Sequence, residues 1–229
     1  MCNSSHVTVC TFRKLYAWAV PVQPDDLTAR ARIREAALEL FAANGIATTS
    51  LRSIAARARV SPSLITHHFG SKTALRNAVD AAVLDAFAQA LESVEVAGSP
   101  EAVSDQINAA IAGIIGGDRA VRDYLGRSLV EATDASQQLF DALSDLVTDG
   151  LEALESAGFV RRGTDERWRA YAVLFIILGP ILLGRQLESR LGTDAFTPDV
   201  VATRSASNID LLRYGLFTTD QRSVPRPRG

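Results

Sequence analysis

Short polar side chains and one imidazole gather on one face of residues 62–69, where they could hydrogen-bond to a nucleic acid. At helical spacing this face consists of Pro62, Ser63, Thr66 and His67, and the opposite face is mostly apolar. Small residues near the start of a helix allow close approach in a DNA major groove, and short donors and acceptors can reach base edges. The pattern favours a DNA-reading helix, but a surface helix with a solvated polar face would show the same periodicity.

The segments around this face have the lengths of a helix-turn-helix. Residues 50–69 comprise a short helix, the three-residue turn Arg59–Ser61 and a second short helix. Ser61 supplies a capping hydroxyl directly before Pro62, which is typical of a helix start. A longer amphipathic helix over residues 28–44 precedes this motif, and another over about 71–94 follows it.

Charge divides the 229-residue chain more sharply than its formal net charge of −2 suggests. Residues 28–79 hold eight Arg and Lys residues against two Glu, whereas residues 80–220 hold 11 Arg against 22 Asp and Glu. A basic helical unit suits a polyanion such as DNA, and the acidic part of the chain would repel one.

The remaining sequence also has helical periodicity, which predicts an all-α fold of about nine helices. After the break at residues 98–100 we expect five helices, over about 101–115, 119–132, 135–157, 165–191 and 198–216. The helix over 165–191 is apolar on all sides in its middle, and Pro180 should bend it. Its apolar run over 171–184 is shorter than the ~20 residues that cross a bilayer, so we expect no membrane partner.

Composition and cysteine usage exclude several classes of protein. The chain is 47% hydrophobic and 22% charged, as is ordinary for a globular protein. Cys2 and Cys10 lie in the first ten residues, so they cannot link a core, and a reducing, cytoplasmic setting is expected. Adjacent His67 and His68 diverge by about 100° on a helix, which opposes a shared metal ion. Without a phosphate loop, a nucleophile elbow or a metal-ligand cluster, the sequence predicts neither an enzyme nor a cofactor.

Residues 31–83 closely resemble the N-terminal domain of the tetracycline-repressor (TetR) family of bacterial transcriptional regulators. The matching motifs are IxxAAxxLFxxxG at 33–45, TSLRxIA at 49–55 and VSxxxIxxHFGSKxxL at 60–75. The match covers about a quarter of the chain without gaps. It implies an N-terminal three-helix DNA-binding domain with a helix-turn-helix motif, followed by a larger C-terminal helical domain for ligand binding and dimerisation.

The resemblance also implies roles for individual residues in binding DNA. Thr49 and Ser50 would cap the second helix and donate to phosphate, and Arg52 would contact a phosphate or a nearby base. His68 and Lys72 match positions that clamp the DNA backbone. The residues expected to face the groove are Ser61, Pro62, Ser63, Thr66 and His67. Many members carry an aromatic pair where this chain has Thr66 and His67. Because Thr66 is shorter than Tyr, a usual phosphate or methyl contact is expected to be missing, so the resemblance implies DNA binding but not the operator sequence.

For the whole chain, the resemblance implies a homodimer that reads a palindromic operator in double-stranded DNA and is released by a small-molecule effector. Dimerisation would use the helices over about 165–191 and 198–216, which could instead complete a monomeric core. Activation rather than repression is also open. Candidate lining residues for an apolar effector are Tyr124, Phe140, Trp168 and Phe175, and the plainer interpretation of each is a core residue.

The expected division of the chain follows these roles. Residues 26–86 would form the DNA-binding domain, and residues 87–217 the effector-binding and dimerisation domain. An extension over residues 1–24 and a tail over 218–229 would be poorly ordered. The alternative function is a helical dimeric protein-interaction module without specific DNA binding, against which the basic unit and the polar face both count.

Overall fold

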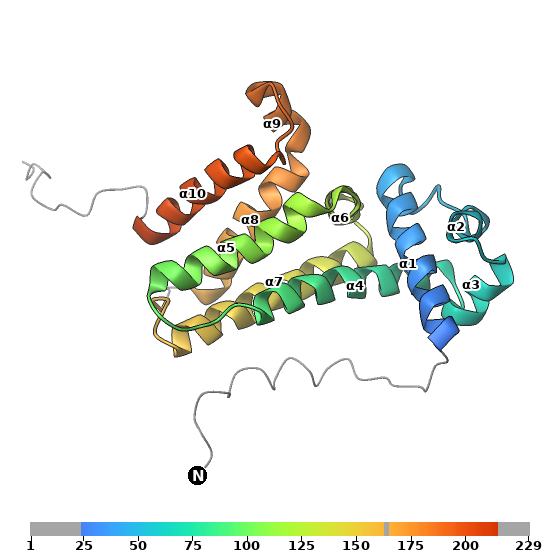
Figure 1. Cartoon of the computed structure of the whole chain (residues 1–229), viewed down its shortest axis with the longest axis horizontal. Helices are drawn as coiled ribbons and strands as arrows, with labels where there is room; N and C mark the ends of the chain where they lie inside the picture. Colours follow the sequence, from blue (N-terminus) through green and yellow to red (C-terminus); the bar gives the residue numbers. More distant parts are fainter. Residues whose placement is uncertain (1–23, 163–164, 215–229) are drawn as a thin grey trace, which may run out of the picture.

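The computed structural model describes residues 24–162 and 165–214, and these fold into ten α-helices without a strand (Figure 1). The helices are α1 (Pro24–Asn44), α2 (Leu51–Ala58), α3 (Pro62–Phe69), α4 (Lys72–Glu92), α5 (Pro100–Gly117), α6 (Arg119–Val130), α7 (Asp134–Ser156), α8 (Glu166–Leu182), α9 (Gly184–Leu191) and α10 (Pro198–Tyr214). The all-α prediction is confirmed. The extension and tail expected over 1–24 and 218–229 lie, except for Pro24, outside the described residues.

The tenth helix arises because the segment predicted as one bent helix over 165–191 is two helices. Pro180 has no N–H to donate, and the chain leaves helical geometry at Leu183, with φ −112° and ψ 21°. The axes of α8 and α9 then differ by 68°. In the described part of the chain no single helix is long and apolar enough to cross a membrane; α8 and α9 reach that length and composition only as a bent pair.

Side-chain caps begin seven of the helices, and those at Ser50 and Ser61 are the ones expected from the sequence. In each case the capping side chain accepts a hydrogen bond from a backbone N–H of the first turn, and such a cap typically stabilises a helix by about 1 kcal/mol. The capping residues are Ser50, Ser61, Ser71, Ser99, Asp118, Thr133 and Asp165. Local sequence therefore places the start of every helix in the motif and of α4.

Helices α1, α2 and α3 form a compact unit, seen at the right in Figure 1. Its centre is built from fully buried apolar side chains on each helix, including Ile33, Phe41, Ile54 and Ile65. The first turns of α4 close this unit through Leu75 and Val79, which are also buried. Helix α4 then leaves the unit and runs into the body, where it packs against α5 and α7.

The unit and the body share one continuous core rather than being joined by a linker. At the contact between α1 and α6 the ring of Phe41 stacks on Tyr124, with centroids 6.4 Å apart. Arg127 of α6 also donates to the carbonyl of Ala43, at 3.2 Å. A movement of α6 or α4 in the body must therefore be transmitted to the helix-turn-helix unit.

Candidate nucleic-acid interface

The angle between α2 and α3 is set by the three-residue turn from Arg59 to Ser61. Arg59 has a left-handed backbone, with φ 57° and ψ 48°, and its N–H donates to the last turn of α2. Val60 donates to the carbonyl of Ala55 at 3.0 Å, which completes the helix end. Ser61 then caps α3 by accepting from the N–H of Leu64 at 3.2 Å. The turn is thus held by backbone bonds, and α3 is fixed against α2.

The outer face of α3 carries the side chains that the sequence predicts. Pro62, Ser63, Thr66 and His67 are exposed, while Ile65 and Phe69 are buried against the unit. The hydroxyls lie close to the helix: Ser61 and Ser63 share a hydrogen bond of 2.8 Å, and Thr66 donates to the carbonyl of Pro62 at 3.3 Å. The face is therefore small and polar, which suits close approach to a groove.

Most cations of the unit form no ion pair with a carboxylate that the structure describes. Two of the eight do: Arg57 binds Glu39 at 2.6 Å, and Arg76 is buried with carboxylates of the body. The six that form no ion pair with a described carboxylate are Arg30, Arg32, Arg34, Arg52, Arg59 and Lys72. Their uncompensated charge stays available for an external polyanion.

Among the residues expected to clamp the DNA backbone, Arg52 is exposed on the first turn of α2. Lys72, at the start of α4, is half-buried and donates from Nζ to the carbonyl of Ala47 at 3.1 Å. That bond ties the start of α4 to the loop between α1 and α2, and it leaves two further N–H donors on the ammonium group. Ser50 faces solvent, where its hydroxyl forms a capping box with Ser53.

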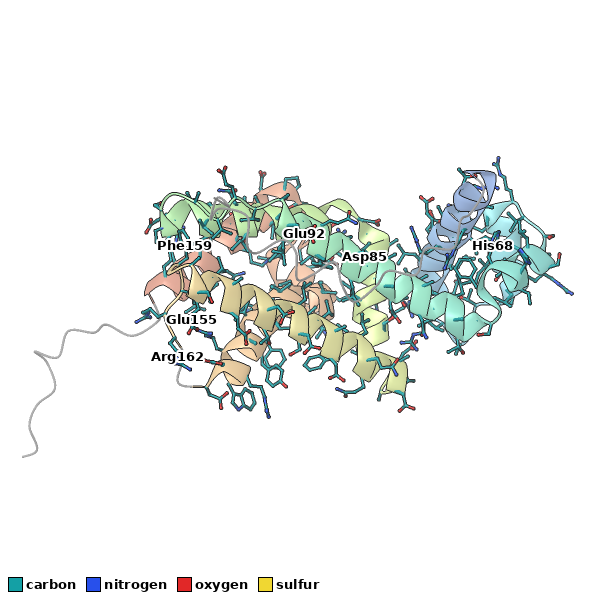
Figure 2. All side chains as sticks on the ribbon, turned by 90° about the horizontal axis from the view of Figure 1, so that it is seen from below. His68, Asp85, Glu92, Glu155, Phe159 and Arg162 are labelled. Carbon is teal, nitrogen blue, oxygen red and sulfur yellow. The ribbon has the colours of Figure 1, made fainter. Side chains whose placement is uncertain are left out.

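Thr49 lies differently from the expectation, whereas His68 stays partly accessible. Thr49 is 3% exposed, and its hydroxyl lies 2.8 Å from the carbonyl oxygen of Gly45 and 3.2 Å from that of Leu40. A buried hydroxyl held by carbonyls cannot also reach a phosphate, so the phosphate contact expected of Thr49 is corrected to a role in shaping the loop. His68 is half-buried, with its ring edge-on to Phe69 at 6.3 Å (Figure 2).

A buried polar network joins α4 to α6 beneath this unit. Arg76 is only 6% exposed and lies 3.7 Å from the carboxylate of Asp80 and 3.5 Å from that of Glu131. The hydroxyl of Tyr124 donates to Asp80 at 2.6 Å. Burial raises the pKa of Asp80 above its ordinary value, and burial beside this carboxylate raises the pKa of Tyr124 well above its ordinary range. The network crosses from the DNA-reading unit to the body.

The body contains a cavity of about 210 Å³ between α4, α5, α7 and α8. Its lining is aliphatic except for Glu92, and it includes Leu91 and Ile111. None of the four effector-lining candidates from the sequence is among the lining residues. Tyr124 belongs to the network just described, and Phe140 packs against the core with its ring 6.0 Å from Tyr171. Trp168 and Phe175 are 65% and 52% exposed on the outer side of α8.

Sequence reasoning missed the cavity because aliphatic residues on a helix look the same whether they fill a core or line a space. Gly150, in the middle of α7, was the available signal. A Cβ placed on it would meet nothing within 4 Å, so this glycine borders open space. Among the described residues, no three His, Cys, Asp or Glu side chains lie together in a group that could hold a metal ion.

Comparison with known proteins bears on both halves of the chain. Residues 33–79 match the family described as "Bacterial regulatory proteins, tetR family", and residues 118–218 match "Tetracyclin repressor-like, C-terminal domain". The HTH-type transcriptional regulatory protein RaaS of Mycobacterium tuberculosis is 33% identical over 163 residues, which cover 71% of this chain and 74% of that protein.

Solved structures with the same arrangement of helices include FadR from Bacillus subtilis in complex with stearoyl-CoA. It has a TM-score of 0.66 and 17% identity, and the match covers 82% of this chain and 99% of that one. PfmR from Thermus thermophilus has a TM-score of 0.60 and 21% identity, with 82% and 97% covered. At these identities the likeness establishes the fold.

Proposed function

Because this chain belongs to the tetR family of bacterial regulatory proteins, and so is a DNA-binding transcriptional regulator rather than an enzyme, we propose that it acts as a homodimeric repressor. In this proposal the dimer occupies a palindromic operator in the cytoplasm, and a small apolar effector releases it. The observation that carries the proposal is the small polar face of α3, within a unit in which six of eight cations form no ion pair with a described carboxylate.

In the proposed interface, one set of residues contacts bases in the major groove and another set contacts the DNA backbone. Ser61, Pro62, Ser63, Thr66 and His67 would lie in the major groove and select the sequence. Ser50, Arg52, His68 and Lys72 would fix the register on the phosphates, where contacts carry affinity but little sequence information. Residues 26–86 would form the domain that does this, and residues 87–217 would form the regulatory domain.

Dimerisation through the last long helices is supported by apolar side chains that the isolated chain leaves in solvent. On α8 these are Trp168, Phe175 and Leu182, and on α10 they are Leu211 and Leu212. Exposed aromatic and leucine side chains in this number are typical of a surface that another protein covers. A two-fold dimer would set its two copies of α3 about one DNA turn apart and so require a palindrome.

The cavity supports release by an effector because it lies at the far end of α4 from the DNA. Helix α4 has 21 residues, which makes it about 30 Å long. Its first residue, Lys72, belongs to the proposed DNA interface, and its last, Glu92, borders the cavity. Occupation of the cavity would change the position of α4 and with it the spacing of the two reading helices. FadR, which has the same fold, holds stearoyl-CoA.

The test is selection of bound DNA from a random pool by the purified full chain at fixed moderate salt. We expect a two-fold symmetric consensus, because each protomer of the dimer reads one half-site. Recovery of no consensus, together with binding that disappears as salt rises, would contradict the proposal. That result would mean that the basic unit binds polyanions without sequence preference. The chain would then be better explained as a protein-interaction module.

A further inference from the structure

The cavity has a lining that can hold an aliphatic group but offers only one side chain for a polar one. Fourteen of its fifteen lining residues are aliphatic or glycine, and the remaining one is Glu92. No described basic residue lines it. A ligand with a polar end must therefore place that end beside a carboxylate or leave it in water.

The mouth of the cavity is at the C-terminal end of α4, where Glu92 lies. Of the lining residues, Glu92 and Val96 are the exposed ones, with Val96 47% exposed, and the others are half-buried. Glu92 forms no hydrogen bond or ion pair with another described residue. Its carboxylate is thus free to meet a ligand that enters between α4 and the segment that follows it.

Two helix ends add to the negative potential at this place. The last turns of α4 and α7 both border the cavity, through Leu91 and Leu154, and neither turn contains a basic residue. A helix C-terminus carries about half a negative charge, which favours a cation nearby. Two basic side chains near the end of α7 are already engaged, because Arg169 of α8 binds Glu155 at 2.8 Å and Arg162 lies 3.9 Å from the same carboxylate. Arg161 is exposed and does not line the cavity. Figure 2 shows Glu155 and Arg162 close together near the end of α7.

We infer that the effector is a cationic amphiphile, whose aliphatic part fills the cavity and whose positive end meets Glu92. The inference rests on the proposed role of the cavity and specifies its ligand. An acyl-CoA shares the aliphatic part but would bring its anionic head to Glu92 and to a body in which acidic residues outnumber basic ones two to one. The negative charge at the mouth therefore favours a ligand with a cationic head over an acyl-CoA such as the one that FadR holds.

The test compares dodecyltrimethylammonium with dodecanoate, each below its micelle-forming concentration, by isothermal titration calorimetry on the full chain. We expect the cation to bind about tenfold more tightly, because one partly screened charge attracts it and repels the anion. Glu92→Gln should remove this preference. Asp85→Asn is the matched control, since Asp85 is exposed on the same helix and does not line the cavity, and it should keep the preference (Figure 2).

A cavity-filling variant separates failure of the inference from failure of the proposed site. Gly150→Phe adds a ring into open space on a helix that gains helix propensity, so the fold should survive and both amphiphiles should lose binding. Equal binding of cation and anion by the wild type, abolished by Gly150→Phe, would overturn the charge preference and leave the cavity as the effector site. Binding that Gly150→Phe does not affect, or no binding at all, would overturn the cavity itself.

Discussion

At the scale of single residues, side chains of one type do different work according to the backbone that carries them. Thr49, Ser50 and Ser61 all precede a helix of the motif, yet Thr49 is buried in its loop while the two serines cap helices at the surface. The same holds for the cations: Arg57 pairs with Glu39, and Arg52, five residues earlier, faces solvent without an ion pair to a described carboxylate. A cation of the second kind can contact a phosphate without first giving up an ion pair.

Arg52→Ala should therefore weaken binding to all DNA sequences alike. Loss of one phosphate contact removes about one released counterion, so the slope of log affinity against log salt should fall by about one unit. Fluorescence anisotropy over a salt series measures this slope. Arg119→Ala is the control, because Arg119 is an exposed arginine of the body paired with Asp123. An unchanged slope for Arg52→Ala would remove Arg52 from the interface.

What the sequence could predict at this scale follows from periodicity. The exposed and buried faces of α3 were predictable, because residues three and four apart share a face of any helix. The burial of Thr49 was not, since three consecutive hydroxyl residues precede α2 and only the path of the loop decides which one turns inward. The position of Glu92 at the cavity could not be predicted from the sequence either, because the residues that line the cavity with it come from the distant helices α5, α7 and α8.

At the scale of elements, the turn between α2 and α3 holds a strained residue. Arg59 adopts the left-handed conformation, which costs a residue with a Cβ about 1 kcal/mol relative to glycine. Arg59→Gly should raise the free energy of unfolding by a few tenths of a kcal/mol up to about 1 kcal/mol, because the relieved strain exceeds the extra entropy of glycine in the unfolded chain; urea denaturation measures this change. Arg59→Ala keeps the Cβ and should stay near the wild-type value. Equal effects of both variants would trace the gain to loss of the positive charge instead.

The junction of α4 and α6 should make stability depend on pH through Asp80. Since burial raises its pKa, the folded chain retains a proton on Asp80 at pH values where the unfolded chain has lost it. The stability that this group contributes is present below its ordinary pKa of 3.8 and is lost as pH rises through the raised value. Urea denaturation should accordingly show the wild type losing stability relative to Asp80→Asn over that window. A pH-independent difference between the wild type and Asp80→Asn would contradict the raised pKa.

The positions of most helices could be predicted from the sequence, because capping serines and prolines occur at helix starts. The exception was the division of α8 from α9, where Pro180 predicts a bend but not that the chain would leave helical geometry three residues later at Leu183. Where a helix bends is set locally; how far it turns depends on what it packs against. Gly184 makes such a tertiary contact, since it lies close to the ring of Phe196. No local sequence pattern predicts this contact.

At the scale of the whole molecule, one helix connects the functions that we propose. Lys72 begins α4 beside the reading unit, Asp80 joins it to α6 in the middle, and Glu92 ends it at the cavity. Tyr124 of α6 stacks on Phe41 of α1 and donates to Asp80 of α4, so α4 cannot move without α6 and α1. In this scheme the rigid assembly has two positions, and DNA binds one of them more tightly while the effector binds the other more tightly. The coupling between effector and DNA would come from these two differences in affinity.

Dimerisation is the remaining requirement of that scheme, and α8 is where it can be tested. Phe175→Glu places a charge in the centre of the exposed apolar face, where burial against a second copy would cost several kcal/mol, so the variant should be monomeric in sedimentation velocity. Because a monomer binds its half-sites independently, affinity for the selected palindrome should fall roughly 10²-fold or more, while affinity for a single half-site stays unchanged. Val130→Glu is the matched control, since Val130 is 67% exposed on α6, and it should remain dimeric. A dimeric Phe175→Glu with full affinity for the palindrome would move the interface away from α8.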